Sequence, residues 1–104
     1  MNLKKQIYEV LFQYGITRAY KGFFPLANLI ELFINQSFFG PQLIEVVAAR
    51  HHISVSTLRR QIKVIANDLD CRDHTSFRQL NGSEQYQLSR FVTNLARIIL
   101  EKTE

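Results

Sequence analysis

The sequence contains few of the features that mark secreted, disulfide-bonded or membrane-spanning proteins. Its 104 residues include no tryptophan and a single cysteine, Cys71. One cysteine cannot form an internal disulfide, so we expect a reducing, cytoplasmic environment. The longest apolar stretch, residues 23–34, is interrupted by Pro25, Asn28 and Glu31, whereas a membrane span needs about 20 mostly apolar residues. The N-terminus shows no small-residue cleavage site, so a secretory signal is not expected either.

The sequence also lacks the alternation of apolar and polar residues that marks β-strands. Apolar residues recur three and four positions apart instead, which is the spacing of one helix face. Gly15 is expected to end a first helix that begins near Leu3. Pro25 and Pro41 are expected to open the second and third, because their fixed φ and missing N–H suit a first turn. A fourth helix is expected over about residues 56–69.

The C-terminal third of the chain divides into a polar segment and a periodic one. Residues 70–80 predict a loop with one short helix. Ser83 is the expected N-cap of a final helix from Glu84 to about Lys102, the longest of the chain, with Glu84 placed favourably against the helix dipole. Because 104 residues fit one core, we predict a single all-α domain, residues 1–104, of five or six helices.

Acidic residues are missing from the middle of the chain. Between Val46 and Asn67 there is no Asp or Glu, while the whole chain has 13 Lys and Arg, nine Asp and Glu, and a net charge of +4. The rest of the chain is balanced, so the excess positive charge lies in this stretch, as in a surface that binds a polyanion. The four cationic residues of the stretch are Arg50, Arg59, Arg60 and Lys63.

The same stretch has the pattern of a helix-turn-helix over about residues 43–69. Ala48 is small enough for the second helix to cross closely over the first. Ile53 is the apolar residue expected to fill the turn. Ser54 or Ser56 can cap the second helix by accepting hydrogen bonds from its first backbone N–H groups.

Polar side chains from Ser56 onward recur at i, i+3, i+4 and i+7, opposite the apolar stripe of that helix. Such a helix can enter the major groove, where arginine can contact guanine O6 and N7 and lysine can contact phosphates. We therefore predict sequence-specific binding of double-stranded DNA. The predicted DNA-binding residues of this segment are Arg50, Ser56, Thr57, Arg59, Arg60 and Lys63.

Three segments in this order resemble one known family over nearly the whole chain. They are YGITRAYKGFFPLANLIEL (14–32), LIEVVAARHHISVSTLRRQIKVI (43–65), and an Asn-Gly-Ser-Glu turn followed by a long helix. The family is the C-terminal DNA-binding domain of the sporulation-initiation response regulators, stage-zero sporulation protein A. The resemblance implies a six-helix domain that binds a short DNA element, often as head-to-tail pairs, and regulates transcription.

The resemblance also implies roles for individual residues. Lys21 corresponds to the family's turn lysine, which can contact a phosphate. Arg59 departs from the family, which usually has an acidic residue there, so the family's target sequence is not transferred. The family's contact with RNA polymerase falls on residues 67–77. The family's receiver domain is not among these 104 residues, so we expect either an excised or standalone effector domain or regulation by something other than aspartate phosphorylation. The implied recognition-helix residues are Ser56, Thr57, Arg60 and Lys63.

Two other interpretations stay open. A helical protein-interaction module, a transcription modulator that keeps the fold without reading DNA, would use exposed aromatic residues, for which the candidates are Phe23, Phe24, Phe38 and Phe39. A zinc site would need ligands whose spacing here matches neither a finger nor a ribbon. Those ligands would be His51, His52, Cys71 and His74.

No glycine-rich phosphate loop or nucleophile motif is present, so we expect neither an enzyme nor a cofactor. His51 and His52 are then residues of the turn that could add partial positive charge near DNA phosphates.

Overall fold

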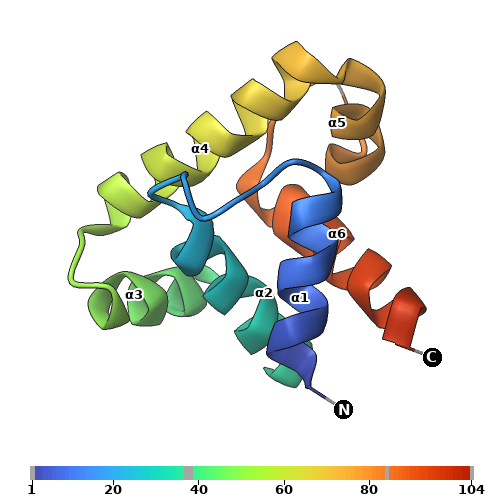
Figure 1. Ribbon diagram of the computed structural model, residues 1–104. Coiled ribbons are helices and arrows are strands. Elements are labelled where there is room, and N and C mark those ends of the chain that lie inside the picture. The colour runs from blue at the N-terminus through green and yellow to red at the C-terminus, as the bar shows by residue number, and fades with distance from the viewer. Residues whose placement is uncertain (1, 37–38, 84, 104) are drawn as a thin grey trace.

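The computed structural model describes residues 2–36, 39–83 and 85–103, and in these ranges it contains six helices and no strand. The predicted all-α class is confirmed (Figure 1). In chain order the helices are α1 (Leu3–Gln13), α2 (Phe23–Gln36), α3 (Pro41–Arg50), α4 (Val55–Arg72), α5 (His74–Asn81) and α6 (Leu88–Thr103).

The helix α2 lies at the centre of the molecule and packs against α1, α3, α4 and α6. It is the most apolar of the six sequences, and Leu26, Leu29 and Ile30 on it are fully buried. Buried side chains from every helix join these in one contiguous core. Because burial of apolar surface is the main driving force of folding, this shared core holds α3 and α4 in place.

The connector between α1 and α2 depends on two glycines. Gly15 takes a φ of +75° and lets the chain turn at the end of α1, where the N–H of Ile16 donates to the carbonyl of Leu11 over 2.9 Å. A Cβ on Gly22 would lie 3.0 Å from the backbone carbonyl of Gln61. The connector therefore touches the backbone of α4, and Figure 1 shows it passing beside that helix.

The start of α2 differs from the prediction, because the helix begins at Phe23 rather than at Pro25. The N–H of Leu26 donates to the carbonyl of Gly22 over 2.9 Å, so Pro25 is the third helical residue. The first N–H groups of a helix have no partner within it, and a proline is tolerated anywhere in this turn.

The segment 70–80 contains the predicted short helix, α5, but it is mostly helical rather than a loop. The helix α4 continues to Arg72 and, with 18 residues, is the longest described helix, ahead of α6 with 16. Asp73 separates it from α5: its N–H donates to Leu69 over 2.7 Å, and its carboxylate accepts from the N–H and hydroxyl of Ser76. The prediction missed that one aspartate can cap a new helix directly after the old one.

The helix α6 begins at Leu88, so Ser83 is not its N-cap; Glu84 lies outside the described residues. The buried side chain of Asn81 explains the late start. Its amide nitrogen donates to the carbonyls of Ser83 (3.0 Å) and residue 85, and its oxygen accepts from the N–H of Gln87 (3.1 Å). These bonds hold the segment after α5 as a loop around Asn81.

No helix in the described part of the chain is both long and apolar enough to cross a membrane.

Candidate nucleic-acid interface

A four-residue turn, residues 51–54, joins α3 to α4. The N–H of Ile53 donates to the carbonyl of Ala48 over 3.0 Å, and that of His52 donates to Ala49 over 3.2 Å. The backbone of His52 itself takes a φ of +56°. This is a Schellman ending, in which a left-handed residue reverses the chain and the next residue packs back on the helix. Ile53 is half-buried against the core, as the sequence predicts for the residue that fills the turn.

Hydroxyl groups gather at the N-terminus of α4. Ser54 is the N-cap: its Oγ accepts from the N–H of Thr57 over 3.1 Å. The same hydroxyl donates to Oγ1 of Thr57 over 2.9 Å and lies 3.1 Å from Oγ of Ser56. Of the two predicted caps, Ser54 is therefore the one used, and Ser56 stays exposed on the first turn.

The two sides of α4 are sharply different. Its apolar stripe, with Leu58, Ile62 and Ile65, is fully buried. The opposite side carries exposed polar side chains, and within the described ranges none of its three cationic residues forms an ion pair. Ser56, Arg59, Arg60 and Lys63 are all exposed, so no helix among the described residues covers this surface. We call it the outward face of α4; its predicted members are Ser56, Arg59, Arg60 and Lys63.

Arg60 and Lys21 lie together, although 39 positions separate them in the sequence. They line one groove of about 370 Å³ with Gln61, Val64 and the end of the connector. The contact of Gly22 with the backbone of Gln61 holds Lys21 there. Lys21, which only the resemblance suggested, is thus placed at the edge of the outward face.

Arg59 lies on the other flank of α4. It lines a separate groove of about 430 Å³ together with Pro41 at the start of α3 and Leu88 at the start of α6. Tyr86 is close to it: burial raises the pKa of Tyr86 to about 12, and the charge of Arg59 opposes that rise. The Tyr86 hydroxyl is buried without a hydrogen-bond partner among the described residues.

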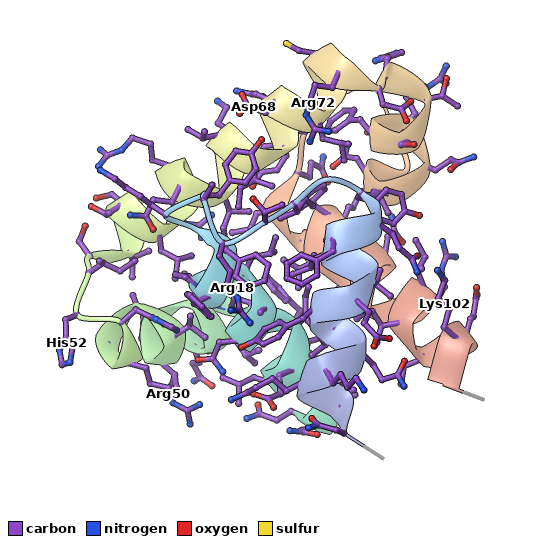
Figure 2. All side chains as sticks on the ribbon, viewed as in Figure 1. Arg18, Arg50, His52, Asp68, Arg72 and Lys102 are labelled. Carbon is purple, nitrogen blue, oxygen red and sulfur yellow. The ribbon has the colours of Figure 1, made fainter. Side chains whose placement is uncertain are left out.

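Arg50 is not brought to the outward face. Figure 2 shows it projecting from α3 on the side away from α4, where it lines a groove with Lys4 and Glu31. Burial, Arg50 and His52 lower the pKa of His51. These effects favour the uncharged form of the His51 imidazole, which weakens the case for positive charge from this residue in the turn.

The geometry also bears on the zinc interpretation. His51 and His52 precede α4, whereas Cys71 and His74 lie at its far end. Sixteen residues of helix separate Val55 from Cys71, or about 24 Å at 1.5 Å per residue. No metal-binding group of three or more residues forms in the described ranges, and this separation excludes a zinc site shared by the four side chains.

The sequence reasoning missed Val64 as a residue of the outward face. It is exposed beside Arg60 in the groove that Lys21 lines. The signal was available, because an apolar residue at position 64 falls outside the buried spacing of positions 58, 62, 65 and 69.

Comparison with known proteins does not assign the chain to a family. No family model matches it, and no curated protein or solved structure matches it either.

Proposed function

We propose that this protein binds double-stranded DNA sequence-specifically and regulates transcription, with α4 as the recognition helix in the major groove. The observation that carries the proposal is the outward face of α4, where Ser56, Arg60 and Lys63 project together without ion pairs in the described part of the chain. A short helix and a four-residue turn precede this face, as in a DNA-reading helix-turn-helix.

The placement of each residue suggests its role. Arg60 lies centrally on the face and is our candidate for a bidentate contact to guanine. Lys21 at one edge of the face, and Arg59 and Lys63 one helical turn apart toward the other edge, suit phosphates. Ser56 and Thr57, in the first turn, suit a base edge or a phosphate. Arg50 projects away, and we propose no base contact for it.

The distribution of charge limits the contact to the first three helical turns of α4. Beyond Lys63 the helix carries Asp68 and Asp70, which DNA phosphates repel. Figure 2 shows Asp68 at the end of α4 remote from the turn. DNA is therefore expected to lie over the turn and the first three helical turns of α4.

The relationship to the stage-zero sporulation protein A effector domain is part of the proposal. Six helices in the described ranges, with the turn lysine beside the recognition helix, support it. The single cysteine supports a cytoplasmic location. From the resemblance we propose head-to-tail pairing on DNA and a contact of residues 67–77 with RNA polymerase.

A second candidate function, a protein-interaction module, is favoured by one surface. Phe12 and Phe24 are 44% and 45% exposed, and their rings contact those of Phe23 and Tyr8. Arg18 lies over the Tyr8 ring at 5.7 Å. Of the aromatic residues predicted to be exposed, Phe23 is fully buried, Phe39 is half-buried and Phe38 lies outside the described residues.

The test is selection of bound fragments from random double-stranded DNA. The proposal predicts enrichment of one common sequence. It also predicts that log K falls linearly with log of salt concentration, with a slope of about −3 if Lys21, Arg59 and Lys63 each neutralise one phosphate. Failure to enrich any sequence would contradict DNA reading. Binding of a protein that is lost with Phe12→Ala or Phe24→Ala and insensitive to salt would favour the second candidate.

A further inference from the structure

Val64 is the apolar member of a surface that is otherwise polar and cationic. Its side chain is 48% exposed, although valine is usually buried. It follows Arg60 by one turn of α4, directly after Lys63, and lines the groove with Lys21. The other large apolar residues that are exposed in the described ranges lie on other helices: Phe12 on α1, Phe24 on α2, Val46 on α3 and Leu100 on α6.

The major groove of DNA offers one apolar group to a protein side chain, the C5-methyl of thymine. A branched aliphatic side chain on a helix in this groove has no hydrogen bond to make, and it gains free energy only by removing apolar surface from water. For an exposed valine beside the central arginine of a recognition helix, the thymine methyl is therefore a better contact partner than any hydrogen-bonding group of the bases.

We propose that Val64 is a specificity-determining residue that contacts the C5-methyl group of a thymine in the target site. This inference rests on the proposed function. Arg60 and Val64 are four residues apart, a rise of about 6 Å, and base pairs follow one another at about 3.4 Å. The required thymine lies about two base pairs from the base pair that Arg60 contacts.

The test compares thymine with uracil, which lacks only the methyl group. The full chain and the Val64→Ala variant are titrated against the selected site, and against copies with each nearby thymine replaced in turn by uracil. For the parent chain, one uracil weakens binding about fourfold, the equivalent of one buried methylene-sized group. For Val64→Ala the same replacement changes binding by less than about 1.5-fold, because its partner is already gone.

The matched control is Val46→Ala, which removes an equally exposed valine from α3. It retains the full fourfold dependence on the thymine methyl. Thermal unfolding of both variants checks that each remains folded, as expected for substitutions at exposed positions.

Three results would overturn the assignment, and they separate failure of the Val64 contact from failure of the proposed function. The Val64 contact is wrong, while DNA reading stands, if the parent chain selects a common sequence but tolerates uracil at every thymine. The same conclusion follows if replacing thymine by uracil weakens binding of Val64→Ala as much as it weakens binding of the parent. If the parent chain selects no sequence, the proposed function fails and the contact fails with it.

Discussion

At the scale of single residues, His52 has a backbone conformation that glycine adopts at lower cost. Its φ of +56° lies in the left-handed region, which costs an L-residue about 1–2 kcal/mol. Glycine relieves this strain, but it also gives the unfolded chain more conformational freedom, which offsets about 0.5–1 kcal/mol of the stabilisation. We predict that His52→Gly raises the free energy of unfolding by about 0.5–1 kcal/mol in urea denaturation.

The matched control for His52 is the preceding histidine. His51 has a φ of −99°, so His51→Gly relieves no strain and lowers stability. If both variants were equally destabilised, the left-handed turn before α4 would be wrong.

Tyr86 carries a buried hydroxyl without a partner in the described part of the chain. Leaving a polar group buried and unpaired costs about 1–3 kcal/mol. We predict that Tyr86→Phe raises the free energy of unfolding by about 1 kcal/mol at neutral pH. Tyr14→Phe, at a half-buried position without such an orphaned hydroxyl, is the control and brings no gain.

The pH dependence of stability tests the environment of Tyr86 independently. Burial raises its pKa from 10.0 to about 12. Below pH 10 the phenol is protonated in both states, and its full contribution is present. Between pH 10 and about 12 only the unfolded chain releases the proton, so the free energy of unfolding falls as pH rises. In Tyr86→Phe the free energy of unfolding therefore falls less between pH 10 and about 12 than in the parent. If the two proteins showed the same pH dependence of stability, the buried environment of Tyr86 would be wrong.

At the scale of elements, Gly22 couples the connector to α4, the proposed recognition helix. An added Cβ would meet the backbone of Gln61 at 3.0 Å, and a helix backbone cannot yield as a side chain can. We predict that Gly22→Ala lowers the free energy of unfolding by about 1–3 kcal/mol. It also weakens DNA binding by moving Lys21 away from Arg60.

The exposed residue Thr17 in the same connector provides the control, since Thr17→Ser keeps the hydroxyl that accepts from the N–H of Ala19 and leaves both stability and DNA binding unchanged. Equal stability of Gly22→Ala and the parent would show that the connector does not pack on α4.

The sequence allows the helices with strong local signals to be predicted, and these position the candidate site. The end of α1 at Gly15 and the start of α3 at Pro41 follow from backbone chemistry that single residues determine. The start of α6 could not be predicted, because it depends on the buried side chain of Asn81 and its bonds to the following loop. A sequence pattern shows the asparagine but not its burial.

The outward face of α4 could be predicted in composition but not in arrangement. Helical spacing places Arg59, Arg60 and Lys63 on the side away from the core. It does not show that Arg59 lies beside the starts of α3 and α6, or that Lys21 lines the same groove as Arg60. Those relations arise from contacts between distant segments, and periodicity within one helix contains no information about them.

At the scale of the whole molecule, charge is distributed along α4 in a way that orients the protein. Three of its four cationic residues, Arg59, Arg60 and Lys63, lie in its first half, while Asp68, Asp70 and Asp73 outnumber Arg72 toward and just beyond its end. This asymmetry steers the turn before α4, and not the junction with α5, toward a polyanion.

The most direct measurement is the affinity of Arg60→Ala for a site selected by the parent chain, beside Lys63→Ala and Arg97→Ala. Arg97 is an exposed arginine on α6 and is the control. We predict that Arg60→Ala loses about 1–3 kcal/mol of binding free energy and relaxes base preference at one position. Lys63→Ala weakens binding evenly over sequences, and Arg97→Ala binds as the parent does. Equal affinity of all four proteins for the selected site would contradict DNA reading by α4.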